Sequence, residues 1–196
     1  MQALDEDARY ARRATVGTTV PLVRVRIVDN EGELAPRDGE SMGELQIHGP
    51  WIAGNYYRLE NSEEKFTADG WLRTGDIATI DDDGYIDITD RTKDVIKSGG
   101  EWISSVQLEN AIMGHEDVAE AAVVAQPDEK WGERPLAAVV LREGRELSSE
   151  DLANFLRERM EKWMVPENYV FVDEIPRTST GKFSKLDLRR QLLQNS

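Results

Sequence analysis

Residues 90–105 read DRTKDVIKSGGEWISS, and the pattern of the whole chain changes within them. Before this stretch, apolar and polar residues alternate in short runs separated by turn residues, which is typical of strands. After it, runs with helical spacing follow Ser104, and Gln107 three positions on is typical of a helix N-terminus. The change predicts an α+β fold, with a β-rich part over residues 1–90 and a small α+β domain over residues 91–196.

Strands are expected in the first part over residues 23–28, 43–49, 76–80 and 85–89. The last two are separated by DDDG at residues 81–84, a hairpin turn that ends in the residue most tolerant of positive φ.

The second part is expected to mix helices with strands. Helices are predicted from Ser104 to Gly114, from Ser148 or Ser149 to Pro166, and from Ser184 or Lys185 onward; strands are predicted over 118–125, 136–141 and 169–172. The second helix is drawn as far as Pro166 because Leu156, Met160 and Trp163 continue its helical spacing. Taken by itself, KSGGE at residues 97–101 indicates a flexible turn before a helix.

Composition excludes several classes of function. The chain has 196 residues, a net charge of −14 and no cysteine, so neither nucleic-acid binding nor a disulfide or thiolate metal site is expected. His48 and His115 are too widely spaced to indicate a zinc site, so no metal ligand is assigned. The N-terminus is acidic, unlike a signal peptide, and no apolar run approaches the ~20 residues needed for a transmembrane segment. These features favour a cytoplasmic globular protein.

Three short segments combine glycine, hydroxyl groups and charge: residues 74–76, 90–102 and 176–185. Each has an ordinary structural explanation when taken singly. The last is not a phosphate-binding P-loop, because Pro176 replaces the first glycine and Phe183 replaces the Ser or Thr. The acidic turn at 81–84 is likewise no calcium loop, because the flanking ligand positions do not match.

Taken in order, these segments resemble the last motifs of the adenylate-forming (AMP-binding) superfamily, which includes acyl-CoA synthetases, luciferases and peptide-synthetase adenylation domains. The similar stretches are GELQIHGP at 43–50 with GNYY at 54–57, DGWLRTGD at 69–76, DRTKDVIK at 90–97 and PRTSTGK at 176–182. KSGGEWISS at 97–105 is especially similar to bacterial and archaeal medium- and long-chain fatty acyl-CoA synthetases.

The resemblance implies that residues 1–90 are the last part of a large N-terminal AMP-binding domain and that residues 91–196 are a mobile C-terminal lid, with a hinge near residues 90–93. The family's phosphate loop and its Tyr-Gly-x-Thr-Glu segment are absent from this sequence. The Mg²⁺ site is expected in that upstream region, and the chain alone is expected to be inactive.

The implied reaction is an acid–thiol ligation in two half-reactions. A fatty acid or other carboxylic acid reacts with ATP to give an acyl-adenylate and pyrophosphate, and CoA then displaces AMP. By resemblance, Asp76 would accept hydrogen bonds from the ribose hydroxyls with Arg91 nearby, and Lys182 would neutralise charge in the adenylation transition state.

Domain alternation is implied for the second half-reaction. The lid would rotate about Lys93, withdraw Lys182 and present the opposite face, with Lys97 and Trp102 toward the adenylate. Gly99 and Gly100 would let the narrow pantetheine arm of CoA run close to the backbone.

Two alternatives stay open from sequence. The enzyme could activate another acid and deliver it to a carrier protein, or the chain could be a noncatalytic module that binds a nucleotide or a partner protein. A homodimer is left open as well.

Overall fold

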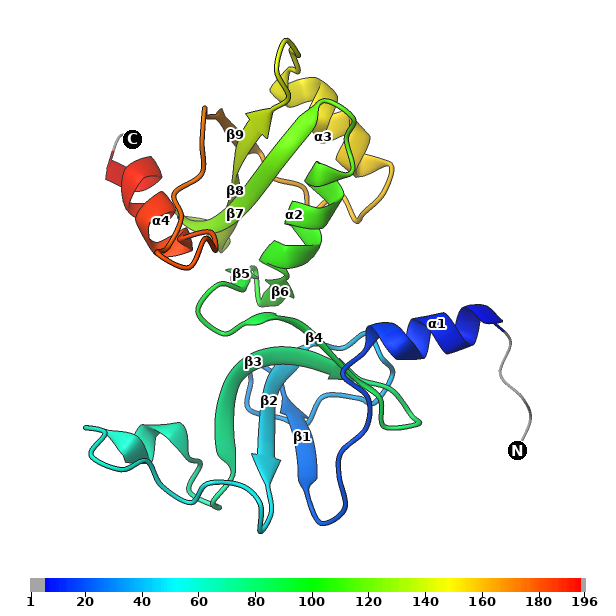
Figure 1. Ribbon diagram of the computed structural model, residues 1–196, viewed down its shortest axis with the longest axis vertical. Helices are drawn as coiled ribbons and strands as arrows, with labels where there is room; N and C mark the ends of the chain where they lie inside the picture. The colour runs from blue at the N-terminus through cyan, green and yellow to red at the C-terminus, as the bar shows by residue number, and fades with distance from the viewer. Residues whose placement is uncertain (1–5, 195–196) are drawn as a thin grey trace. The chain divides into compact units, whose positions relative to one another are not determined.

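The computed structural model describes residues 6–194 and divides the chain into two compact units, the first ending at Lys93 and the second beginning at Asp94 (Figure 1). Each unit has its own sheet and its own buried apolar core. The predicted α+β class is confirmed.

The first unit is built on a four-stranded antiparallel sheet in the order β1-β2-β3-β4. Its strands are β1 (Arg24–Val28), β2 (Gly43–His48), β3 (Leu72–Ile80) and β4 (Ile86–Arg91). Alternate residues of these strands meet in a core of Ile27, Leu45, Ala78, Ile80 and Ile86. The four strands expected from alternation are confirmed, as is the turn between β3 and β4, where Gly84 has φ +88°.

Two helical elements of this unit were not predicted. They are α1 (Glu6–Ala14) and the 3₁₀ helix η1 (Ser62–Lys65). The Arg12 side chain of α1 forms an ion pair with Asp83 and lies 4.7 Å from the centre of the Tyr85 ring. These contacts hold the helix against the β3–β4 turn. They join residues about 70 positions apart in the chain, so a local sequence pattern does not predict them.

The second unit holds a five-stranded sheet. Antiparallel pairing gives the order β6-β5-β8-β7, and β9 adds to β8 in parallel. The strands are β5 (Ile96–Ser98), β6 (Glu101–Ile103), β7 (Val118–Asp128), β8 (Gly132–Leu141) and β9 (Asn168–Phe171); the helices are α2 (Ser105–Met113), α3 (Ser149–Arg157) and α4 (Lys185–Gln194).

Successive residues of β7 face opposite cores, as the two-residue repeat of a strand requires. Ala121 and Val123 pack in one apolar cluster with residues of α2 and α3, whereas Ala122 and Val124 pack in another with Leu188 of α4. The sheet is therefore covered on both faces, which explains why β7 and β8 read as nearly continuous apolar runs.

The predicted helix caps are confirmed. Ser104 Oγ accepts a hydrogen bond of 3.1 Å from the N–H of Gln107, and Ser148 Oγ accepts one of 3.1 Å from Asp151. Each bond satisfies a backbone donor that has no partner inside the first helical turn.

The predicted extension of the second helix to Pro166 is wrong. α3 ends at Arg157, and the carbonyls of Trp163 and Val165 accept hydrogen bonds from the buried guanidinium of Arg134 on β8. Helical spacing at Met160 and Trp163 was misleading, because the backbone after Arg157 forms turns and a distant arginine binds two of its carbonyls. Within residues 6–194, no helix is long and apolar enough to cross a membrane.

Candidate functional site

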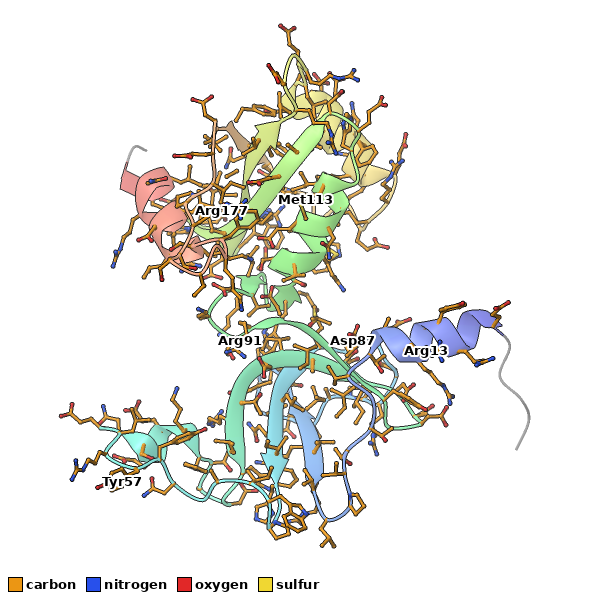
Figure 2. All side chains as sticks on the ribbon, in the orientation of Figure 1. Arg13, Tyr57, Asp87, Arg91, Met113 and Arg177 are labelled. Carbon is orange, nitrogen blue, oxygen red and sulfur yellow. The ribbon has the colours of Figure 1, made fainter. Side chains whose placement is uncertain are left out.

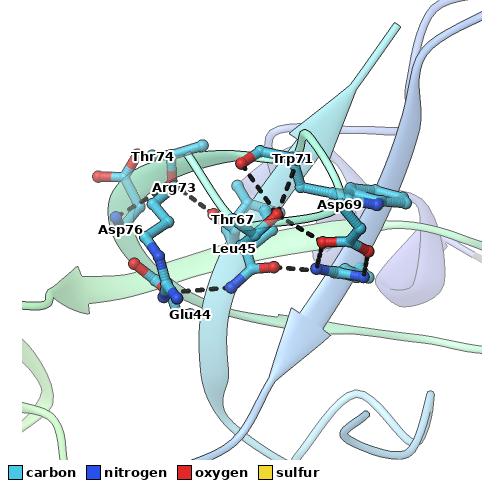
Figure 3. A network of polar contacts seen from close by, with 10 residues as sticks. Glu44, Leu45, Thr67, Asp69, Trp71, Arg73, Thr74 and Asp76 are labelled. Carbon is cyan, nitrogen blue, oxygen red and sulfur yellow. Dashed lines mark hydrogen bonds and ion pairs between the residues drawn. The ribbon is translucent and has the colours of Figure 1, made fainter. Parts of the chain in front are cut away.

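Thr74, Gly75 and Asp76 form a bulge in β3. Gln46 pairs with Arg73 and Glu44 pairs with Ile77, so three residues of β3 stand opposite the single residue Leu45. Thr74 Oγ1 donates to the carbonyl of Leu45 at 2.9 Å and accepts from the N–H of Asp76 at 3.1 Å (Figure 3). Gly75 has φ +75°, which a residue with a side chain adopts only with strain. The bulge thus fixes the backbone that carries the Asp76 carboxylate.

Asp76 and Arg91 are partners across β3 and β4, and their side chains form an ion pair. The carboxylate is 18 % exposed and the guanidinium 58 % exposed, so the pair opens to the surface on its arginine side (Figure 2). Two backbone bonds brace it: the N–H of Arg91 donates to Asp90 Oδ1 at 2.7 Å, and the N–H of Thr92 donates to the carbonyl of Gly75 at 2.9 Å. The structure brings together two residues that the sequence had assigned to the same nucleotide.

A polar network runs along the neighbouring strands toward this bulge (Figure 3). Arg26 makes two bonds to Asp69, of 2.8 and 3.1 Å, and its Nε donates to Gln46 Oε1 at 2.8 Å. Gln46 donates on to Glu44 at 3.1 Å, and Arg73 donates to the same Glu44 oxygen at 2.6 Å. This network links β1, β2 and β3, and no local sequence pattern predicted it.

Asp69 is held as a carboxylate at one end of that network. The Arg26 guanidinium, and next the Thr67 hydroxyl, lower the pKa of Asp69 to about 2. The Arg26 guanidinium also lies 4.5 Å from the centre of the Trp71 ring. Asp69 and Trp71 belong to the DGWLRTGD stretch, so part of that motif serves to brace the strand that carries Asp76.

In the second unit, KSGGE is a β-hairpin and not the flexible turn expected from it singly. Lys97 pairs with Trp102 and Ser98 pairs with Glu101 across β5 and β6, and Gly99 and Gly100 form the turn with φ +62° and +93°. Lys97 Nζ lies 6.0 Å from the centre of the Trp102 ring. Three-residue strands are too short to produce a readable alternation, which is why the prediction failed.

A cavity of about 400 Å³ lies beside this hairpin. It is lined by Ser98, Gly99, Glu101, Trp131, Arg134, Lys162, Trp163 and Glu167. Two indole rings, two basic side chains and two carboxylates therefore share one hollow, and the flat indole faces suit an aromatic ring.

Sequence reasoning missed Trp131 and Arg134 in this cavity. The carbonyl of Trp131 accepts a 2.8 Å hydrogen bond from the N–H of Gly99. Arg134 is 7 % exposed and its Nη1 donates to Ser98 Oγ at 3.2 Å, 36 positions away in sequence. No local pattern marks either residue, because each acquires its place through a distant partner.

Lys182 lies on a second hairpin that precedes α4. The N–H of Thr178 donates to the carbonyl of Lys182 at 2.8 Å, and the N–H of Ser184 donates to the carbonyl of Pro176 at 2.7 Å. Gly181, with φ +82°, closes the turn through a 2.9 Å bond to the carbonyl of Thr178. The Lys182 side chain is exposed, so the hydrogen-bonded hairpin presents its ammonium group at the surface.

The predicted site residues are thus divided between the two units. Asp76, Arg91 and Lys93 belong to the first, and the second carries Lys97, Gly99, Gly100, Trp102 and Lys182. Within the second unit, Lys97, Gly99, Gly100 and Trp102 share one hairpin, and Lys182 occupies another.

Comparisons with known proteins identify relatives of this chain. Residues 107–182 match the family model described as the AMP-binding enzyme C-terminal domain. The chain is 52 % identical over 192 residues to a long-chain-fatty-acid–CoA ligase of Thermus thermophilus, covering 97 % of this chain and 36 % of the relative. It is 41 % identical over 188 residues to a medium-chain-fatty-acid–CoA ligase of Ectopseudomonas oleovorans, covering 96 % and 34 %.

Solved structures also match this chain. ATP-bound MatB from Rhodopseudomonas palustris is 31 % identical, with a TM-score of 0.77 over 91 % of this chain and 35 % of that protein. The o-succinylbenzoate CoA synthetase MenE of Bacillus subtilis, in complex with its acyl-adenylate intermediate, is 30 % identical, with a TM-score of 0.77 over 96 % and 37 %. The chain therefore spans little more than a third of the length of the proteins it matches.

Proposed function

We propose that this chain forms the C-terminal part of an AMP-forming fatty acid–CoA ligase. The chain belongs to the AMP-binding enzymes and contains their C-terminal domain. The observation that carries the proposal is the braced Asp76–Arg91 pair in one unit together with the exposed Lys182 hairpin in the other. The names of two of the relatives favour a medium- or long-chain fatty acid as the substrate. Residues 1–90 would then complete a large AMP-binding domain, and residues 91–196 would be its lid.

Asp76 is the proposed ribose ligand. An ionised carboxylate accepts hydrogen bonds from two neighbouring hydroxyls strongly, and the bond from the N–H of Asp76 to Thr74 restrains the backbone that carries it. Arg91 forms an ion pair with Asp76 and would add a planar donor beside the sugar. Both groups bind ATP in the first half-reaction and AMP as it leaves in the second.

Lys182 is the proposed catalytic residue of adenylation. An oxygen of the acid attacks the α-phosphorus of ATP, the new O–P bond forms, and the bond to the pyrophosphate oxygen breaks. Negative charge gathers on the oxygens between the two reactants, and the ammonium of Lys182 neutralises it there. Mg²⁺ is expected to assist from upstream of this chain. Among residues 6–194, no group of three or more His, Asp or Glu side chains could hold a metal ion, so no step is assigned to one here.

Thioester formation is proposed to use the other hairpin after the lid turns about Lys93. The sulfur of CoA attacks the acyl carbon, and the bond to the AMP oxygen breaks. Gly99 and Gly100 lack a Cβ, so a narrow chain can pass close to their backbone, while Lys97 and Trp102 would face the adenylate. The indoles of Trp131 and Trp163 offer flat faces suited to the adenine of CoA.

The test uses the full-length enzyme that contains this chain. We expect acid-dependent exchange of pyrophosphate into ATP, and release of free acyl-CoA when CoA is added. An enzyme that makes acyl-AMP but transfers it only to a carrier protein would overturn the CoA assignment in favour of carrier delivery. Absence of any acid-dependent exchange would favour a noncatalytic module. The 196-residue chain alone should form no acyl-AMP. The cytoplasmic location stays a prediction.

A further inference from the structure

The segment that carries Lys182 contacts the sheet and α2 through Lys185, three residues after the lysine. Lys185, the first residue of α4, places its Nζ 2.7 Å from Glu109 Oε1 and 2.6 Å from Ser105 Oγ. The same Glu109 oxygen accepts a 2.8 Å bond from the N–H of Val123 on β7. The side chains of Lys185 and Glu109 are only 14 % and 11 % exposed. This ion pair therefore joins the start of α4 to α2 and β7 in a partly dry environment, where charge pairs are strong.

A second fastening lies just before the lysine. Arg177 Nη2 contacts Glu120 Oε1 on β7 at 2.5 Å, and Arg177 Nη1 donates to the carbonyl of Gly181 at 2.9 Å. Its guanidinium also lies 4.6 Å from the centre of the Phe183 ring. One arginine thus closes the hairpin across its two arms and ties the hairpin to the sheet.

We propose that Arg177 and Lys185 are positioning residues that fix the backbone of Lys182 for adenylation. Their charged groups are paired with Glu120 and Glu109. Lysine has a long flexible stem, so the ammonium can be aimed only if the backbone beneath it does not move. A displacement of about 1 Å at a reacting centre can cost a factor of about 100 in rate. This inference rests on the role proposed for Lys182.

The experiment measures both half-reactions of the full-length enzyme, together with its thermal unfolding. Arg177→Ala should lower the rate constant of ATP–pyrophosphate exchange by about 10-fold or more and leave the KM for ATP unchanged. Thioester formation from supplied acyl-AMP should change by less than about twofold, because it uses the other hairpin. Arg157→Ala removes an exposed arginine that contacts Asn154 on α3, and it serves as the matched control with both rates unchanged.

Replacing Lys185 alone would leave the carboxylate of Glu109 without its ion-pair partner, so both residues are changed together. Glu109→Gln combined with Lys185→Met removes both charges at once, which is far better tolerated than removing either partner alone. We expect this double variant to unfold near the parent temperature and still lose exchange activity. For Arg177, the double variant with Glu120→Ala should lose no more exchange activity than Arg177→Ala alone, because the two side chains act as one unit.

The outcomes distinguish the role proposed for Lys182 from the positioning role proposed for Arg177 and Lys185. If Lys182→Ala abolishes exchange while Arg177→Ala and the Glu109/Lys185 double variant keep it, the positioning inference is wrong and the function proposed for Lys182 stands. If both half-reactions fall in step with the unfolding temperature, the residues only stabilise the fold, and the inference is again wrong. If Lys182→Ala itself keeps full exchange, the proposed function fails first.

Discussion

The backbone N–H of Gly99 donates a 2.8 Å hydrogen bond to the carbonyl of Trp131, and the indole of Trp131 lies where residue 99 would carry a Cβ. That Cβ would be 2.7 Å from Trp131 Cε3, closer than such carbons come in real structures. The missing side chain at residue 99 is therefore what allows the hairpin and the tryptophan to form one wall of the cavity.

Gly99→Ala should both strain the backbone and push Trp131 out of place. We expect a loss of about 2 kcal/mol in the free energy of unfolding, because positive φ and a close contact act together. Gly100→Ala is the matched control: its φ is +93° but its Cβ would meet open space, so the loss should be about 1 kcal/mol. Urea unfolding followed by tryptophan fluorescence measures both; equal losses would contradict the role given to Trp131.

Asp76→Asn should weaken nucleotide binding without unfolding the chain. The amide cannot accept hydroxyl bonds as an ionised carboxylate does, so the KM for ATP should rise by about 10-fold or more. Stability should change by less than about 1 kcal/mol, since the Arg91 side of the ion pair is exposed. Asp87→Asn removes an exposed carboxylate from the same unit and should leave the KM unchanged.

Lys182→Ala should separate the two half-reactions. Loss of the ammonium should reduce acid-dependent ATP–pyrophosphate exchange by about 100-fold or more, because a charge is removed from the transition state alone. Thioester formation from supplied acyl-AMP should persist. Lys65→Ala, at an exposed lysine of η1, is the control with both rates retained. Equal loss of both half-reactions after Lys182→Ala would speak against the assignment.

Lys93→Pro should block the turn of the lid. Proline fixes φ near −65° and restricts the residue before it, so a hinge at this position could no longer change conformation. We expect adenylation to continue and acyl-CoA formation to slow by about 10-fold or more. Lys93→Ala, which keeps the backbone free, should behave as the parent enzyme. Unchanged turnover in the proline variant would move the hinge elsewhere.

Tyr169 on β9 gives a pH prediction. Burial disfavours the phenolate and raises the pKa of Tyr169 from 10.0 to about 12. The unfolded chain releases this proton near pH 10 while the folded chain retains it, so stability contributed by the group is complete below pH 10 and falls as the pH rises toward 12. Tyr169→Phe should reduce that alkaline loss in urea unfolding.

At neutral pH the same variant should change the free energy of unfolding by less than about 1 kcal/mol, because the buried hydroxyl has no hydrogen-bond partner among the described residues. An identical alkaline loss in Tyr169→Phe and the parent would show that other groups cause it.

Much of the fold follows from interactions that span only a few residues. The alternation at Arg24–Val28 predicts β1, and the hydroxyls of Ser104 and Ser148 predict where α2 and α3 begin. The loop that follows the α3 end at Arg157 could not be predicted in this way, because two of its carbonyls bind a guanidinium on β8. The candidate site divides similarly. Asp76 and Lys182 stand in recognisable motifs, whereas Trp131 does not.

The sequence by itself determined the periodicity of the main strands, the helix caps, the order of the motifs and the absence of cysteine ligands, since each depends on residue type and near neighbours. Only the tertiary structure decided that Asp76 pairs with Arg91, that Trp131 closes over Gly99, and that Lys185 meets Glu109 from 76 positions away in the chain. The physical reason is that such contacts are paired by packing of the sheets and helices, and no local pattern specifies which distant side chain packing will bring near.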